Sequence, residues 1–247
     1  MTSKSLCFNR LGPCAAKALG ALLALAYLAL SAGTAQAATL RTVQGNVEIV
    51  RDGVTLPAVQ GQRLKRGDVL QSAPAVEASS ASGTATPGGE ALVRFDDGAR
   101  VALRSDSRFE MQELRQNGPE SYRQITFNIL KGSLRYISGL ATLRKKVTFT
   151  TSTATIGIRG TDIEIVVSEE PVQDNNPGTY LKVNTGAATL TAADGAKVDV
   201  APGEVAYGGE PELTMRGGGG VRRASARMVK AVGSGLFKAS GIDALMK

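Results

Sequence analysis

The chain has 247 residues, of which 43% are hydrophobic, and it contains no Trp, no His and two Cys. Both cysteines, Cys7 and Cys14, lie in the first 37 residues. Disulfides, thiol catalysis, zinc sites with nitrogen or sulfur ligands and Ser-His-Asp triads are therefore excluded from the remainder.

The formal net charge of +7 belongs to the two ends of the chain. Three basic residues and no acid precede Ala38, and the segment from Arg216 onward has seven basic residues and one acid. Subtracting these three and six charges from +7 leaves residues 38–215 near −2. The body of the protein therefore gives no reason to expect nucleic-acid binding.

Residues 1–37 have the pattern of a secretory signal peptide. Basic residues precede an apolar run from Ala18 to Leu30, and Ala35-Gln36-Ala37 is a small-x-small cleavage signal. We expect cleavage after Ala37 and a periplasmic or secreted mature protein. A retained membrane anchor is the alternative, but the run is shorter than the roughly 20 residues that span a bilayer.

The body, residues 38–210, shows period-two alternation and no sustained helical period. Turn signals such as Asp52-Gly53 and Asp97-Gly98 separate short apolar runs, which predicts hairpins. A weak repeat relates residues 45–64 to residues 186–205. We predict an all-β domain of stacked hairpins in a short-stranded β-roll, β-helix-like or sandwich form, and the sequence does not choose among these.

Residues 72–90 interrupt this pattern with Ser, Ala, Gly, Pro and Thr and show no apolar period. This composition predicts a flexible insertion at a loop tip, because the strand pattern resumes on its far side. A linker between two small domains is the alternative.

The segment from Thr153 to Val167 predicts two strands that meet at a corner. Gly157 and Gly160 bracket Arg159, and glycines permit backbone angles or close approaches that a Cβ forbids. We expect a structural role for Gly157, Arg159, Gly160 and Thr161, with Arg159 bound to carbonyls or a carboxylate. Contact of Arg159 with a partner or ligand is the alternative.

Two groups of acidic and amide side chains are candidates for a catalytic or metal-binding role. Asp162 and Glu164 share one strand face about 7 Å apart, within the range of glycosidase carboxylate pairs. Any exposed strand face produces this spacing, and no aromatic sugar platform accompanies it.

The segment Asp174-Asn175-Asn176 offers calcium ligands but lacks a complete ligand loop, so a turn is the simpler explanation. We predict no catalytic residues, no metal site and no cofactor.

The C-terminal residues 211–247 are expected to form a Gly-rich joint and a basic tail. Val221, Ala224, Met228 and Val232 recur at helical spacing, which predicts a short C-terminal amphipathic helix. Its surface-binding candidates are Arg222, Arg223, Arg227 and Lys230. Such a helix suits peripheral contact with anionic lipid or an acidic partner, and a solvated, partly disordered end is the alternative.

Five ordered blocks resemble the FecR domain family: GQRLKRGDVLQS, LVRFDDGARVALRSDSRFEM, ITFNILKGSLRY, VTFTTSTATIGIRGTDIEIV and YLKVNTGAATL. The resemblance covers about Gly45 to Glu204, and ATIGIRGT is its most specific element. Departures are Ala99 after Asp-Gly, Ser152-Thr153 in place of Thr-Pro, and the insertion at 72–90. The resemblance implies a periplasmic all-β sensing or scaffold domain, but the family's cytoplasmic segment and membrane helix have no counterpart here.

Three hypotheses of function follow. The first is a non-enzymatic exported module for binding or sensing that engages an envelope protein partner in signalling or assembly. The second is a structural envelope protein that contacts wall polymer or the membrane surface. The third, an envelope hydrolase, is disfavoured because the nucleophile machinery is missing.

Overall fold

The structure is a computed structural model that describes residues 38–76, 85–117, 122–139, 145–172, 175–210, 213–216, 219–222, 225–229, 235–237 and 241–246. The predicted signal peptide lies outside these residues. The strands are β1 (Ala38–Gln44), β2 (Val47–Arg51), β3 (Val54–Pro57), β4 (Arg63–Leu64), β5 (Val69–Ser72), β6 (Glu90–Phe95), β7 (Arg100–Leu103), β8 (Arg108–Asn117), β9 (Tyr122–Ile137), β10 (Lys145–Thr150), β11 (Ala154–Ser168), β12 (Gly178–Ala192), β13 (Lys197–Val200), β14 (Val205–Gly208), β15 (Leu213–Arg216), β16 (Gly219–Arg222) and β17 (Ala226–Met228). A 3-10 helix, η2, spans Gly241–Met246.

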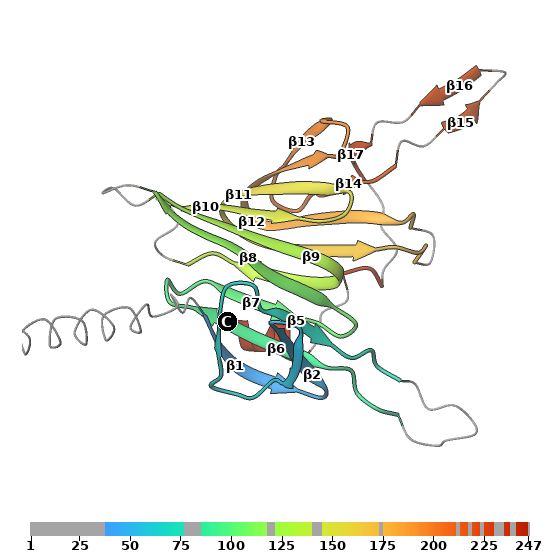
Figure 1. The fold of residues 1–247 in the computed structure, drawn as a ribbon. Coiled ribbons are helices and arrows are strands. Elements are labelled where there is room, and N and C mark those ends of the chain that lie inside the picture. The colour runs from blue at the N-terminus through green and yellow to red at the C-terminus, as the bar shows by residue number, and fades with distance from the viewer. Residues whose placement is uncertain are drawn as a thin grey trace, which may run out of the picture. The chain divides into compact units, whose positions relative to one another are not determined.

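Fifteen of the strands in the described part of the chain form one hydrogen-bonded sheet, and β15 and β16 form a separate hairpin (Figure 1). Neighbouring strands are antiparallel except β9 and β10, which run parallel. The predicted all-β class is thus confirmed.

Three long strands divide the sheet into two halves. The first part of β9 pairs with β8 and β10, whereas its second part pairs with β7 and β11. The strands β11 and β12 change partners in the same way. The first half-sheet has the order β3-β2-β5-β8-β9-β10-β11-β12-β13, and the second half-sheet has the order β4-β1-β6-β7-β9-β11-β12-β14-β17.

A glycine with positive φ marks the change of partners in each long strand. These residues are Gly132 in β9 (φ 88°), Gly160 in β11 (φ 57°) and Gly186 in β12 (φ 84°). A Cβ on Gly186 would lie 2.3 Å from the Gly160 carbonyl oxygen, so these two bends depend on each other. The predicted corner in the Thr153–Val167 segment is therefore a bend within one continuous strand.

The inner faces of the two half-sheets share one hydrophobic core. Phe127, in the first part of β9, contacts Phe95 of β6 and Tyr136 in the second part of β9, with ring centroids 5.3 and 6.2 Å apart. Aromatic rings thus join the two faces. The choice among β-roll, β-helix-like and sandwich stays a prediction, because continuous strands connect the halves.

The predicted C-terminal helix is wrong for the residues that the structure describes. Gly219–Arg222 form β16, and Ala226–Met228 form β17, which pairs with β14 at the edge of the second half-sheet. Backbone pairing with an existing sheet edge outweighs the weak helical periodicity of this Gly-flanked segment. The only helical element among the described residues of the tail is η2, farther along the chain.

The ends of the 72–90 insertion are built into the fold. Ser72 belongs to β5, Glu90 begins β6, and Val76 and Thr86 form an antiparallel bridge. A Cβ on Gly89 would lie 1.9 Å from the Asn46 carbonyl oxygen, so this glycine allows a close backbone approach. Flexibility therefore stays a prediction only for residues 77–84, which lie outside the described residues.

Among the described residues, no helix has the length and apolar character needed to cross a membrane.

Candidate functional site

The family motif lies where β11 passes from the first half-sheet to the second. Gly160 requires its left-handed backbone, and Thr161 is buried there, with its amide donating to Ser138 Oγ at 2.7 Å. Gly157 differs from this expectation, since its φ is outside the left-handed region and a Cβ would meet nothing within 4 Å. Neither the backbone conformation nor a close contact therefore requires a glycine at position 157.

Arg159 is exposed, and no described residue binds its guanidinium. The expected hydrogen bonds to carbonyls or a carboxylate are thus not found in this part of the structure. Arg159 is paired with Ala187 of β12, in the last residue pair before the register shift at the bend.

The alternation in β11 separates carboxylates from core residues as predicted. Ile163 and Ile165 enter the core, whereas Asp162 and Glu164 lie on the outer face of the second half-sheet. Arg135 of β9 binds Asp162 in a bidentate manner, with distances of 2.9 and 2.6 Å. Asn184 of β12 donates to both carboxylates at 3.2 Å. Asp162 is therefore already neutralised by the neighbouring strand.

Glu164 is at the centre of a buried ion-pair network that the sequence did not reveal. It accepts from Arg104 Nη2 at 2.6 Å and from Lys182 Nζ at 3.1 Å. Arg104 also donates from Nε to Asp243 of η2 at 2.9 Å. Arg104, Glu164 and Asp243 are each only 5–6% exposed. Along the chain, Arg104 is 60 residues from Glu164 and 139 residues from Asp243, so the C-terminal segment completes this charge network.

Nearby cations keep the carboxyl groups of Glu164 and Asp162 ionised. Burial alone would raise the pKa of Glu164, but hydrogen bonds and attraction from Arg104 outweigh it and lower that pKa. The same competition, with Arg135 as the main partner, lowers the pKa of Asp162. Burial opposes the charge of Arg104, yet its two carboxylate partners raise its pKa. These contacts thus favour the charged forms of Glu164, Asp162 and Arg104.

The C-terminal segment covers this outer face with apolar side chains as well. Ile242 and Met246 of η2 pack on Leu92 and Ala102, and Leu236 packs near Val166. The red η2 segment lies beside β6 in Figure 1. The tail is therefore bound to the domain at these positions.

The predicted basic surface of the tail is only partly described. The guanidinium of Arg227 lies over the Tyr207 ring, 4.4 Å from its centroid, so it contacts its own domain. Arg222 is in β16, and Arg223 and Lys230 lie outside the described residues.

The acidic segment before Pro177 forms a turn in its described part. Asn175 is buried, and its amide donates to the Val172 carbonyl at 3.1 Å, whereas the Asn176 carbonyl accepts from Tyr180. Asp174 lies outside the described residues. No group of three or more acidic, His or Cys side chains placed to hold a metal ion is found among the residues that were described.

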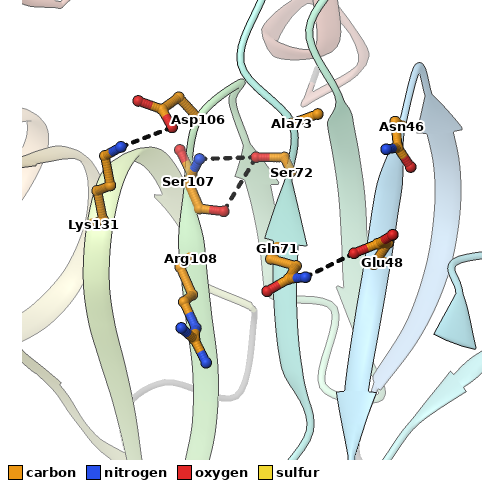
Figure 2. A pocket seen from close by; sticks show the side chains of 9 residues that line it. All are labelled: Asn46, Glu48, Gln71, Ser72, Ala73, Asp106, Ser107, Arg108 and Lys131. Carbon is orange, nitrogen blue, oxygen red and sulfur yellow. Dashed lines mark hydrogen bonds and ion pairs between the residues drawn. The ribbon is translucent and has the colours of Figure 1, made fainter. Parts of the chain in front are cut away.

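A hollow of about 240 Å³ lies on the first half-sheet, beside β2, β5 and β8. Figure 2 shows the side chains that line it. Glu48 accepts from Gln71 at 2.7 Å, and Lys131 pairs with Asp106 at 2.9 Å. The Ser72 hydroxyl donates to the Arg104 carbonyl and accepts from the Ser107 amide. These polar groups bind one another, which gives the hollow a structural explanation.

A second hollow, of about 680 Å³, lies on the outer face of the second half-sheet. Arg41 of β1, Arg94 of β6 and Arg100 of β7 line it together with Leu92 and Leu245. We name it the arginine hollow. The alternation in β6 signals it, because Val93 and Phe95 point into the core and place Arg94 outside, but the sequence does not show that three strands bring their arginines together.

The fold and these surfaces define an all-β domain with one folded-over sheet and an outer face held by ion pairs. The sequence profile of the family described as FecR protein matches residues 83–189. Residues 83–189 therefore match the FecR family, as the later ordered blocks predicted, whereas the block GQRLKRGDVLQS lies outside the matched range. No curated protein matches the sequence.

The solved structures that match include two crystal structures of a presumed anti-sigma factor from Parabacteroides distasonis ATCC 8503. Each is 14% identical, and they cover 47% and 48% of this chain with TM-scores of 0.36 and 0.37. The chain spans about half the length of those structures, 49% and 50%. A likeness at this level carries no argument about function.

Proposed function

We propose that the protein is a non-enzymatic, exported FecR-like module that engages a protein partner of the cell envelope in signalling or assembly. The observation that carries this proposal is the FecR domain over residues 83–189. The signal-peptide pattern of residues 1–37 supports export to the periplasm or beyond.

The state of the two motif carboxylates supports a non-enzymatic role. A glycosidase needs one carboxyl group that holds its proton near neutral pH and can donate it. Asp162 and Glu164 are instead bound by cations, and the pKa of each is lowered. A pair in this state serves to fix strands β9, β11 and β12 to one another.

The absence of cysteine after residue 37 allows a direct test of the proposal. A single cysteine can be placed at exposed Arg94, on the outer face of the second half-sheet, or at exposed Thr55 of β3, on the first half-sheet. Each variant is exported, coupled to a maleimide photocrosslinker and irradiated in the envelope of the source bacterium. Captured proteins are then identified by mass spectrometry.

We expect one envelope protein to be captured from one of these two positions and not from the other. Capture of wall polymer without protein would favour the structural-envelope hypothesis and contradict the proposal. Retention of the chain in the cytoplasm would contradict the exported location.

A further inference from the structure

The C-terminal segment lies on the outer face of the second half-sheet as a short, separate element. Within the described part of the chain, η2 forms no strand pair with the sheet. It is attached by a hydrogen bond of 3.2 Å from the Ile242 amide to the Glu90 carboxylate, by the ion pair of Asp243 with Arg104, and by apolar contacts. A 3-10 helix of six residues has little stability of its own, so these contacts hold it in place.

The sheet surface under η2 combines apolar side chains with one buried cation. Leu92 of β6, Ala102 of β7 and the partly buried Ile137 of β9 form a cluster with the apolar side chains of η2. Arg104 follows β7, is buried, and pairs with Asp243 of η2. We name Leu92, Ala102, Arg104 and Ile137 the tail-docking surface. This surface accepts a segment that presents an acid among aliphatic residues.

The guanidinium of Arg104 is not fully satisfied by its present partners. Its Nε donates to Asp243 and its Nη2 to Glu164, whereas Nη1 is buried and has no hydrogen-bond partner among the described residues. A buried donor that lacks a partner costs free energy. A segment that brings a carboxylate and one further acceptor to this position would therefore satisfy Arg104 more completely than η2 does.

The tail-docking surface continues beyond η2. Leu92 also lines the arginine hollow, and so does Leu245, which is the exposed apolar residue of η2. The hollow of about 680 Å³ thus opens directly beside the segment. A longer segment than η2 has room to extend there.

The burial pattern of η2 defines the segment that fits. Ile242, Asp243 and Met246 are buried, whereas Ala244 and Leu245 are exposed. The buried positions are thus an aliphatic residue, the acid that follows it and a second apolar residue three positions later. Because the cation is buried, a side chain that enters the surface reaches it and the plane of a lipid membrane does not. A protein segment is therefore the favoured occupant.

We propose that the tail-docking surface binds a segment of the protein partner with this pattern, and that the segment displaces η2. The partner's carboxylate binds Arg104, and its apolar side chains take the positions of Ile242 and Met246. In the free protein, η2 is an internal competitor that covers the surface. This proposal rests on the proposed function, because it assigns the partner's contact site.

The test measures binding of an acetylated and amidated peptide with the sequence of η2, Gly-Ile-Asp-Ala-Leu-Met, to the isotope-labelled full chain by NMR titration. In the comparison peptide, Asn replaces Asp. The release variants of the chain are Ile242→Ala and Met246→Ala, which weaken the contacts of its own η2 and leave the tail-docking surface unchanged. The matched control is Leu245→Ala, because this residue is exposed and η2 should stay bound.

We expect the Asp peptide to shift the amide signals of Leu92, Ala102 and Arg104 in both release variants. The Asn peptide should bind at least tenfold more weakly, because it lacks the charge that pairs with Arg104. The wild type and Leu245→Ala should also bind at least tenfold more weakly, because a tethered segment competes at a local concentration on the order of 1 mM.

Three results would overturn the proposal. They are an absence of binding to the folded release variants, equal affinities for the two peptides, and equal affinities of the wild type and the release variants. A second copy of the chain offers the same η2 pattern, so light scattering is measured as well. A dimer that the Asp peptide dissociates would assign the surface to a second copy and reject a foreign partner segment there.

Photocrosslinking in the presence of a competitor separates this proposal from the proposed function. The cysteine position that captures the partner is combined with Ile242→Ala and irradiated in isolated envelopes with an excess of either peptide. We expect the Asp peptide to reduce capture at least tenfold and the Asn peptide to leave it unchanged. Capture that persists in excess Asp peptide would leave the proposed function standing and reject the tail-docking surface as the contact site. Peptide binding without partner capture from either position would contradict the proposed function and leave the tail-docking surface as a peptide-binding site.

Discussion

Gly160 and Gly157 share one motif but differ in backbone conformation. We predict that Gly160→Ala lowers the free energy of unfolding by about 1–2 kcal/mol, because a Cβ is strained at φ 57°. Gly157→Ala should leave it unchanged or raise it by about 0.5 kcal/mol, since a Cβ there meets no atom within 4 Å. Urea denaturation of both variants checks this, and equal losses would contradict the assigned bend.

Glu164 stabilises the outer face through buried cations. We predict that Glu164→Gln lowers the free energy of unfolding by about 3 kcal/mol, because it leaves the buried charge of Arg104 with one carboxylate partner fewer. The control is Lys131→Gln, which removes an exposed ion pair with Asp106 and should cost less than about 1 kcal/mol. Similar losses in the two variants would argue against the network.

The same network predicts how stability depends on pH. The pKa values of Glu164 and Asp162 are lowered in the folded protein from ordinary values of 4.5 and 3.8. The unfolded chain therefore takes up protons first as the pH falls, and this contribution to stability, complete above about pH 5.5, is lost as the pH falls through the folded pKa values. Urea denaturation from pH 7 to pH 3 should show a shallower loss for Glu164→Gln than for the wild type.

At the scale of elements, η2 closes the outer face of the second half-sheet. We predict that Ile242→Ala costs about 2 kcal/mol, because this side chain is fully buried against Leu92 and Ala102. Leu245→Ala, on the same helix at 46% exposure, should cost less than about 0.5 kcal/mol. Hydrogen exchange of residues 241–246 should rise in the first variant alone.

Local sequence patterns predicted strand β11 correctly but not the C-terminal elements. Period-two alternation correctly placed Ile163 and Ile165 in the core and Asp162 and Glu164 on the opposite face, because strand geometry is local. The predicted C-terminal helix is wrong at the described residues 221–222 and 226–228, because pairing of β17 with β14 depends on a sheet edge that the local pattern does not contain.

The candidate site depends on contacts that alternation cannot reveal. Arg104 can be placed on an outer face from its spacing to Val101 and Leu103, but its partner Asp243 lies 139 residues away. The arginine hollow likewise requires the order β1-β6-β7, which is set by the fold.

At the scale of the molecule, continuous strands join the two half-sheets. The sequence correctly predicted the all-β class, but it did not predict strands that are shared by two half-sheets. The bends at Gly132, Gly160 and Gly186 instead let single strands serve both halves. Of these three glycines, the sequence indicates a bend only at Gly160. The chain has 29 glycines, and the strand partners, rather than the local sequence, determine which of them adopt a positive φ.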